Sequence, residues 1–460
     1  MDQLSHAALT IALELALFAA VIFAIFGTED ILIDALHIAG FGKRRLPPVD
    51  ELVPIRGRFA VFIPAWQEST VIGTMLAMAS RLWHDKEIRF YIGVYPNDLA
   101  TLLAAKNAAA NDVRIRIVLN HEAGPTTKGA CLNRLWQACR ADQRSGVFSA
   151  DFVLLHDAED CVDAGALALL SEALQTHDYA QIPVVPILNA QSRWIGGHYC
   201  DEFAESHLKD MPVRHALGAA IPLAGVGCAF RTDALVNLAD RSAPFCADSL
   251  TEDYELGLRL SAAGARGTFV RRRTLGGQLV ATRSYFPHRI NLAVRQKTRW
   301  LRGISFDAWD RLGWISQPGS PLFSKLIGHW MLWRDRRAVI AALAILCGYS
   351  AIIITVAVLF LSAAPLPNMF AEHPILQLLF IYNLMLLAWR VAVRAACVGH
   401  VYGWRCAPLA VLRIPVGNIL LVMTAWRAML GYLRGRRGAA IIWDKTEHHL
   451  PVALTIERRK

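Results

Sequence analysis

Short apolar runs, each closed by a polar turn, characterise the first half of this chain. They cover residues 59–63, 89–95, 113–119 and 152–156, and stretches with helical spacing follow, as at 69–83. Short apolar runs bounded by turn residues are typical of strands buried in a sheet. Strand and helix units repeated in this way predict an α/β fold whose doubly wound sheet is mainly parallel. Ligands of such sheets bind at the carboxyl ends of the strands, where several acidic residues of this chain fall.

Longer apolar runs near both ends of the chain have the length of membrane-spanning helices. Residues 7–26 contain a single acidic residue, and residues 338–364 contain no charged residue. About 20 apolar residues suffice to cross the hydrocarbon core of a bilayer. Residues 374–389 form a third and shorter predicted span, and we expect the flanking Arg390 and Arg394 to reach the lipid headgroups.

A fourth apolar run, at 409–430, is interrupted by Arg413 and Arg427, among other residues. Only 13 residues lie between these arginines, which is about 20 Å of helix against a hydrocarbon core of about 30 Å. A span here would also export the basic residues at 434–437, which the positive-inside rule keeps in the cytoplasm. We therefore predict three spans and one interfacial helix, with the N-terminus outside.

The net charge of +10 arises from 48 Lys and Arg against 38 Asp and Glu, and much of the excess lies in short clusters. These clusters are at 43–45, 271–273, 334–337 and 434–437, and three of the four flank apolar runs. This pattern favours a membrane surface and indicates no nucleic-acid partner. The nine cysteines lack paired spacing, which predicts reduced thiols and neither a disulfide framework nor a zinc site.

These patterns divide the chain into four parts. Residues 1–45 form an N-terminal transmembrane helix, and residues 46–315 form a cytosolic α/β domain. Residues 316–405 hold an interfacial segment and two transmembrane helices, and residues 406–460 hold the interfacial helix and a cytosolic tail. The tail contains the sequence Trp-Asp-Lys-Thr-Glu-His-His at 443–449, which is either a mobile flap using Lys445 and Thr446 or a solvated tail.

Closely spaced carboxylates follow the predicted strand at 152–156. Asp157 and Glu159 are two residues apart, so their side chains can project toward the same site, with Asp160 beside them. Such acids suit Mg²⁺ or Mn²⁺, which would bridge the oxygens of a nucleotide diphosphate. A solvated acidic turn fits the same residues.

A second acidic pair and a cationic, aromatic motif lie farther along the chain. Glu252 and Asp253 open a helical pattern, where one acid is either a proton acceptor or a helix cap. Gln296, Arg299 and Trp300 recur at helical spacing and share one face. A guanidinium can hold a diphosphate and an indole can stack on a sugar, although a surface helix anchored by its Trp has the same sequence. Together these motifs predict a group-transfer enzyme.

The motifs resemble those of family 2 glycosyltransferases with the GT-A fold, of the membrane-integrated type that includes cellulose and hyaluronan synthases. The resemblance covers roughly residues 55–310. Residues 63–68 resemble the nucleotide-binding loop, 97–98 the aspartate of the second strand, and 128–133 the Lys-Ala-Gly-Ala-Leu-Asn donor motif. Residues 157–159 resemble the Asp-x-Asp metal motif with Glu at its third place, 251–253 the motif ending in the base, and 296–300 Gln-x-x-Arg-Trp. Residues 225–227 lie where the family has its acceptor loop.

The resemblance implies specific roles for these residues. Asp253, preceded by Glu252, would be the catalytic base of an inverting displacement, and Mg²⁺ or Mn²⁺ would lie at Asp157 with Glu159 or Asp160. The implied donor-binding residues are Pro64, Glu68, Asp98, Lys128 and Asn133. The implied acceptor and diphosphate residues are Gln296, Arg299, Trp300, Gly225 and Gly227.

The resemblance also implies substrates and a location. We expect a UDP-sugar donor of the hexose or N-acetylhexosamine type and a growing glycan or lipid-linked acceptor. The setting would be the bacterial inner membrane, and the product would be a cell-surface or secreted polysaccharide. Three spans make a narrow channel, so export would need a partner or a homo-oligomer. The alternatives are transfer of a single sugar to a lipid carrier, and a non-catalytic membrane receptor or scaffold with a transferase fold.

Overall fold

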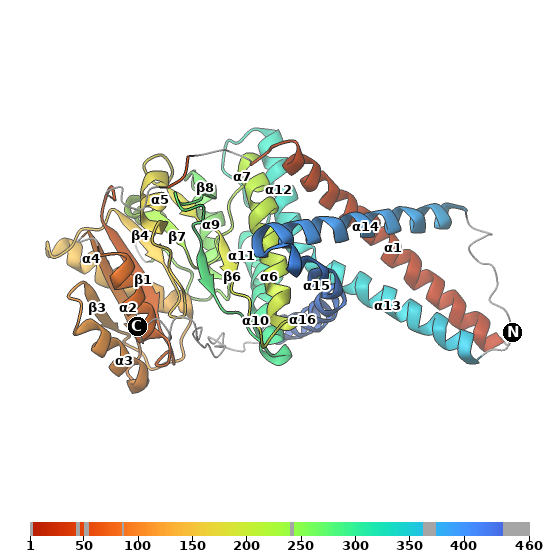
Figure 1. Ribbon diagram of the computed structural model, residues 1–460, viewed down its shortest axis with the longest axis horizontal. Helices are drawn as coiled ribbons and strands as arrows, with labels where there is room; N and C mark the ends of the chain where they lie inside the picture. Colours follow the sequence, from red (N-terminus) through yellow and green to blue (C-terminus); the bar gives the residue numbers. More distant parts are fainter. Residues whose placement is uncertain are drawn as a thin grey trace.

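The sheet domain has the predicted α/β architecture. The computed structural model describes residues 3–42, 47–49, 55–84, 87–239, 243–361 and 374–435. Within these residues, seven strands form one sheet in the order β3-β2-β1-β4-β7-β5-β8 (Figure 1). The strands are β1 (Phe59–Pro64), β2 (Ile88–Val94), β3 (Ile115–Leu119), β4 (Phe152–Leu155), β5 (Tyr179–Gln181), β7 (Cys228–Arg231) and β8 (Gly267–Phe269). β7 is antiparallel to β4 and β5 and the other pairs are parallel, which confirms the mainly parallel sheet.

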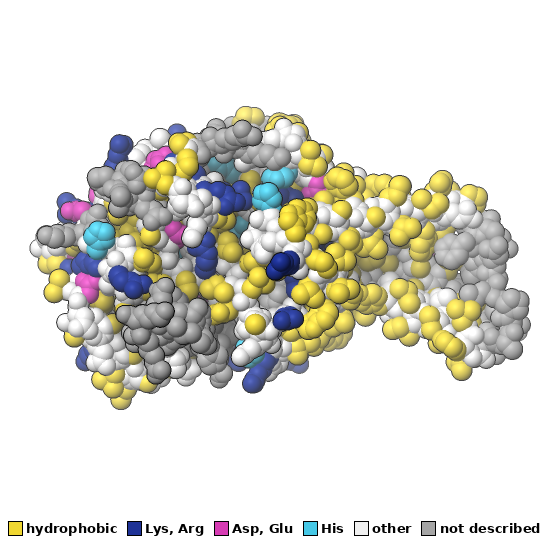
Figure 2. All heavy atoms as spheres, in the orientation of Figure 1, with side chains coloured by type: hydrophobic (Ala, Val, Ile, Leu, Met, Phe, Trp, Pro, Cys, Tyr) yellow, Lys and Arg dark blue, Asp and Glu magenta, His cyan; other side chains and the backbone are white. Residues whose placement is uncertain are grey.

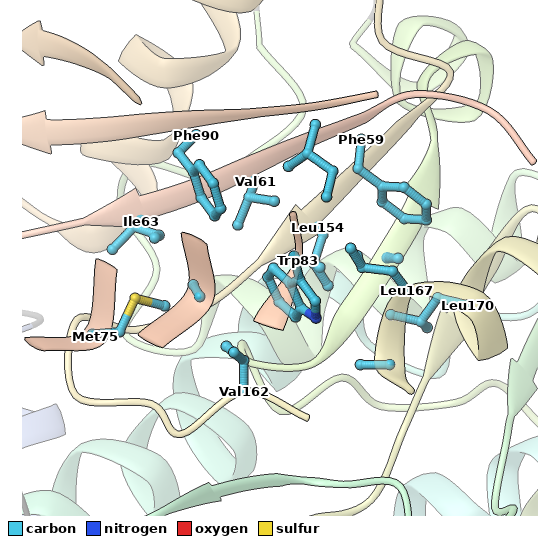
Figure 3. Close-up of a cluster of buried hydrophobic side chains, with 14 of the residues drawn as sticks. Phe59, Val61, Ile63, Met75, Trp83, Phe90, Leu154, Val162, Leu167 and Leu170 are labelled. Atoms are coloured by element: carbon cyan, nitrogen blue, oxygen red, sulfur yellow. The ribbon is translucent and has the colours of Figure 1, made fainter. Parts of the chain in front are cut away.

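Helices cover both faces of this sheet, and the period-two alternation of β1 serves both layers. Phe59, Val61 and Ile63 pack on one side with α2, α3 and α5, and Figure 3 shows these three side chains in that cluster. Ala60 and Phe62 pack on the other side with α4, α8 and α9. The helices are α2 (Ile72–Leu82), α3 (Leu99–Ala109), α4 (Lys128–Arg144), α5 (Ala166–Ala173), α8 (Thr232–Leu238) and α9 (Glu252–Ala262). Because helices cover both faces, ligands can approach this sheet at the edge where its strands end.

The direction of β7 brings distant loops together at that edge. Leu155, the last residue of β4, pairs with Cys228, the first residue of β7. The turn after β4 and the loop before β7 therefore meet. β6 (Val184–Pro186) and β9 (Thr282–Ser284) pair as a separate small sheet and deliver the residues after β9 to the same place.

A layer of helices separates the sheet domain from the long apolar helices. It contains α6 (Ile195–Glu205), η1 (Ser206–Asp210), α7 (Met211–Ala216), α10 (Ile290–Arg302), η2 (Gly303–Asp307), α11 (Ala308–Leu312) and α12 (Leu322–Arg336). In Figure 1, α6, α10 and α12 stand between the strands and the bundle. The active-site residues of α10 therefore lie where the two halves of the molecule meet.

Four helices in the described part are long and apolar enough to cross a membrane, judged by length and composition. They are α1 (Gln3–Ile38), α13 (Ala338–Leu361), α14 (Pro374–Tyr402) and α16 (Ile414–Gly435). In Figure 1, α1, α13 and α14 extend away from the sheet domain, and in Figure 2 hydrophobic side chains cover most of this extension. α16 follows η3 (Trp404–Cys406) and α15 (Ala407–Leu412) and stays beside α10. Three spans and one interfacial helix therefore remain our prediction.

Two arginines of α14 lie in ion pairs within the protein, and the expectation of contact with lipid headgroups is wrong for Arg394, whose side chain is buried. The helix runs 13 residues past the predicted end at 389, to Tyr402. Arg390 pairs with Asp30 of α1 at 2.9 Å, and Arg394 pairs with Glu205 of α6 at 2.5 Å. The attraction between an arginine and an acid is stronger in a partly buried site than in water, because the local dielectric constant is lower. These pairs fasten α14 to both α1 and α6.

A buried ion pair joins α6 to the start of α16, and we predict that it is needed for stability. Arg413 and Asp201 form two hydrogen bonds of 2.6 and 2.7 Å, and both side chains are almost fully buried. Replacing Asp201 by Asn leaves the Arg413 charge uncompensated, which costs about 3–5 kcal/mol. The thermal unfolding midpoint of the full chain in detergent should fall clearly. The exposed pair Arg231 and Asp233 is the control, since Arg231→Ala should cost about 1 kcal/mol or less.

An equal, small effect of both substitutions would show that the buried pair does not hold α16 on the domain.

Candidate active site

A cleft of about 1140 Å³, counted to its open mouth, lies at the carboxyl edge of the sheet. It is bounded by the ends of β1 and β4, the start of α4, the loop before β7, the start of α9, the residues after β9 and one face of α10. The predicted site residues that line it are Pro64, Glu68, Lys128, Asp157, Glu159, Asp160, Glu252, Asp253, Gln296, Arg299 and Trp300. Motifs up to 236 residues apart in the chain therefore face one space.

Lys128 stands at the centre of the acidic part of the cleft. Its Nζ lies 2.6 Å from Asp157 Oδ1 and 3.9 Å from Glu252 Oε1, and it donates to the carbonyl of Gly225 at 3.4 Å. Thr127 caps α4 by accepting the backbone N–H of Ala130, which fixes the start of the helix that carries Lys128. Burial alone would lower the pKa of Lys128, but the surrounding carboxylates raise it above its usual value. Lys128 therefore stays charged and holds the acids together.

Burial also shifts the two acids at the start of α9. The pKa of Glu252 is raised to about 7 by burial and by the charge of Asp253. The pKa of Asp253 is raised by burial, while the charge of Lys128 opposes that shift. Asp253 Oδ1 accepts the backbone N–H of Tyr254, which directs the carboxyl group into the cleft. A carboxylate whose pKa is raised is a better proton acceptor than an ordinary one.

Carboxylates outnumber cations in the cleft, which suits a divalent ion. Lys128 and Arg299 provide two cationic side chains against six acids, which are Glu68, Asp157, Glu159, Asp160, Glu252 and Asp253. Among the described residues, no group of three or more His, Cys, Asp or Glu is placed to hold a metal by itself. An ion at Asp157 and Glu159 would therefore complete its shell with phosphate oxygens and water, as Mg²⁺ commonly does.

Asp160 has a different partner from the other acids of this turn. Its Oδ2 lies 2.8 Å from His156 Nδ1 and accepts the backbone N–H of Asp157 at 3.0 Å. The side chain is almost fully buried. Asp160 thus holds the turn in shape, and the geometry favours Glu159 as the acid that accompanies Asp157.

Gln296, Arg299 and Trp300 face the cleft from α10. Gln296 Oε1 and Arg299 Nε are buried and have no hydrogen-bond partner among the residues that the structure describes, so both atoms are available to a ligand. Trp300 contacts Phe203 and Phe286 edge-on, with ring centroids 6.5 and 6.3 Å apart. A guanidinium beside an indole held by other rings is suited to a diphosphate and a sugar.

Three predicted residues shape loops and do not line the cleft. Asp98 accepts the backbone N–H groups of Gln67 at 2.5 Å and Thr101 at 3.2 Å, and it caps α3. Asn133 exchanges two hydrogen bonds with the backbone of Phe245. Gly227 has a φ of +59°, and a Cβ there would lie 2.3 Å from Thr282 Oγ1.

The predicted flap residues Lys445 and Thr446 lie outside the described residues.

The sequence analysis missed cleft residues that belong to no motif. Thr127, Ser249, Phe203 and Phe286 line the cleft, and the last two come from α6 and from the segment after β9. Aromatic residues in such segments are common, so no sequence signal could separate these from core residues.

Gly225 lies against the proposed base, and we predict that it tolerates no side chain. Its φ is +72°, and a Cβ would lie 2.5 Å from Asp253 Oδ2 and 3.1 Å from Lys128 Nζ. Gly225→Ala should therefore displace Asp253 and lower the transfer rate by about 100-fold, since a shift of about 1 Å costs that much. Gly218 has the same φ and no atom within 4 Å of its Cβ position.

Gly218→Ala is therefore the matched control. Both variants should lose similar stability in thermal unfolding, because the backbone strain is the same. Equal rates for the two variants would show that Gly225 is required for its backbone conformation alone.

Known proteins match this chain in sequence and in structure. The family described as Glycosyltransferase like family 2 matches residues 56–303. Bacteriophage adsorption protein B of Escherichia coli K12 and Bacteriophage N4 adsorption protein B of Escherichia coli O157:H7 are each 32% identical over 472 aligned positions. These matches cover 95% of this chain and 62% of each relative, so the chain spans less than two thirds of their length.

A solved structure has the same overall fold. Mannosyltransferase PcManGT from Pyrobaculum calidifontis, in complex with GDP-Man and Mn²⁺, has a TM-score of 0.52 at 14% identity, covering 95% of this chain and 100% of that one. At this identity the likeness concerns the fold alone. It agrees with the GT-A architecture of the sheet domain.

Proposed function

The chain belongs to glycosyltransferase family 2, and from that premise we propose that it transfers a sugar from a UDP-sugar to a growing glycan at the bacterial inner membrane. The observation that carries the proposal is the cleft that Asp253, Asp157, Lys128 and Arg299 line together. A proton acceptor, a cation site and a diphosphate site are the parts that glycosyl transfer needs.

In the proposed reaction, Asp253 takes the proton of an acceptor hydroxyl as the hydroxyl oxygen attacks the anomeric carbon of the donor. The bond from that carbon to the diphosphate breaks in the same displacement, so the configuration inverts. Arg299 and Lys128 bring positive charge to the departing diphosphate, and the buried Nε of Arg299 has a hydrogen bond to donate. A bound Mg²⁺ or Mn²⁺ supplies further charge neutralisation at the diphosphate.

Trp300 forms the platform for the acceptor sugar in this proposal. Its indole lines the cleft, and Phe203 and Phe286 pack against it edge-on. Sugar rings pack well on such apolar aromatic faces. The sheet domain would face the cytoplasm, where nucleotide sugars are made, and the apolar helices would hold the acceptor end close to the membrane.

The first test is release of nucleoside diphosphate by the purified full chain from a panel of UDP-hexoses and UDP-N-acetylhexosamines, with GDP-mannose as a further donor. Membrane extract supplies the acceptor, and Mg²⁺ or Mn²⁺ is either present or chelated by EDTA. One donor should give metal-dependent release together with a labelled product. A ladder of products on a gel supports glycan synthesis, whereas one lipid-soluble species supports single transfer to a lipid carrier. Donor binding without any turnover would contradict the proposal and favour a receptor or scaffold.

A further inference from the structure

Lys297 belongs to the helix of Gln296 and Arg299 but does not line the cleft. Its Nζ forms an ion pair with Glu202 of α6, and it lies 4.8 Å from the centroid of the Tyr199 ring. A cation at this distance over an aromatic face is attracted by the π electrons of the ring. Lys297 therefore grips α6 through both a carboxylate and an aromatic ring.

Tyr199 is the ring that lies directly behind the proposed acceptor platform. It is fully buried, and its ring meets Trp300 edge-on at 6.1 Å with an interplanar angle of 85°. It also stacks on Phe286 at 4.9 Å, and its hydroxyl donates to the carbonyl of Ala293 at 3.4 Å. A tilt of Tyr199 would consequently be passed to the indole of Trp300, because close-packed rings move together.

Glu202 completes the arrangement and ties it to α16. Its carboxylate accepts from Lys297 and lies 3.1 Å from His198 Nε2. The neighbouring His198 and Lys297 lower the pKa of Glu202 and outweigh its partial desolvation, so it is ionised at neutral pH. The His198 ring lies against Gly417 of α16, where a Cβ would be 2.6 Å from Cε1. One side of α6 thus packs on a candidate membrane helix and the other on the aromatic cluster.

We propose that Lys297 and Glu202 are positioning residues that fix the orientation of Trp300 through Tyr199. The inference rests on the proposed function where it identifies the ligand of Trp300 as the acceptor sugar. The contact between Lys297 and Tyr199, and that between Tyr199 and Trp300, do not depend on it. Loss of the ammonium leaves Tyr199 without the cation on one face and Glu202 without one of its two charged partners, so the platform loses its fixed angle.

The structural link is tested by fluorine NMR of the full chain labelled with 5-fluorotryptophan in detergent micelles. The Trp300 signal is assigned by its absence in Trp300→Phe. Lys297→Met and Glu202→Gln should each shift or broaden this signal, and Lys297→Arg should restore it, because Arg keeps the charge over the ring. Lys325→Met on α12, outside the cleft, is the matched control and should leave it unchanged. An unchanged Trp300 signal in both Lys297→Met and Glu202→Gln overturns the inference.

The functional link is tested by kinetics with the donor found above. Lys297→Met should raise the KM for the acceptor about tenfold, the order expected for one buried cation–π contact, with the KM for the donor unchanged. Lys297→Arg should recover most of the loss. A raised donor KM with an unaltered acceptor KM would contradict acceptor positioning. A shifted fluorine signal without product from any variant or wild type counts against the transferase function, whereas product formation with an unshifted signal counts against Lys297.

Discussion

Replacing Asp253 by Asn is expected to lower the sugar transfer rate by about 10²–10⁴-fold, the range that a positioned general base contributes. The amide keeps the size of the side chain and its place beside Gly225. It cannot take the proton from the hydroxyl group of the acceptor sugar. Asp253 lines the cleft together with Lys128. Because Asn has the size of Asp and Lys128 is unchanged, donor binding should change little. The measurement is nucleoside diphosphate release and product formation, with the donor dissociation constant determined separately.

Glu252→Gln is the matched comparison for Asp253→Asn. The two acids are adjacent at the start of α9, Glu252 is buried and Asp253 is half-buried, and the pKa of Glu252 is raised to about 7. A Gln at 252 should keep most of the rate, because it preserves the size of the side chain and leaves the carboxylate of Asp253 in place as the proposed base. The reverse result, loss of activity in Glu252→Gln and its retention in Asp253→Asn, would move the role of base to Glu252.

Replacing Asp157 by Asn should weaken metal-dependent binding of UDP by at least about tenfold, since loss of an outer partner of a metal ligand already costs that much. Asp157 contacts Lys128 and lines the cleft, so its loss removes a ligand of the ion and leaves Lys128 with weaker partners. Titration of UDP with Mn²⁺, and again with EDTA, measures the effect. In EDTA the wild type and the variant should bind UDP with similarly low affinity.

Glu159→Gln and Asp160→Asn decide which neighbour completes the site. Glu159→Gln should reduce metal-dependent binding as Asp157→Asn does. Asp160 is bonded to His156 and to the backbone of Asp157, so Asp160→Asn should lower the thermal unfolding midpoint and leave most of the metal dependence. Equal losses of metal-dependent binding at 157 and 160, with none at 159, would show that Asp160 is the second ligand.

The motif-bearing segments of the cleft were identifiable from the sequence because each motif follows a recognisable element. The acids at 157–160 follow a strand, and the residues at 296–300 share a helical face, so their approximate placement needed only strand and helix geometry. Family membership, the mainly parallel sheet and the long apolar helices are all confirmed. The choice between three and four spans remains a prediction, because α16 has the length of a span and yet packs beside α10.

The sequence alone could not show which groups Asp98 and Asn133 bond to in the fold. Both occur in motifs, but their side chains bond to the backbones of neighbouring loops. A polar side chain in a conserved-looking pattern can serve a ligand or a loop, and the difference depends on where the chain passes next. In the same way, Arg390 and Arg394 flank an apolar run, and the acids that pair with them come from α1 and α6, far away in the chain.

By itself the sequence determined the fold class, the family, the apolar helices and the order of the acidic and aromatic motifs, because these depend on local periodicity and short-range spacing. The tertiary structure alone decided that Lys128 stands among three acids, that Asp160 bonds to His156, and that Tyr199, Phe203 and Phe286 enclose Trp300. Each of these contacts joins side chains brought together by the packing of separate elements. The register of β7 against β4 and the seating of α6 on α10 set their distances, and such packing has no one-dimensional signature.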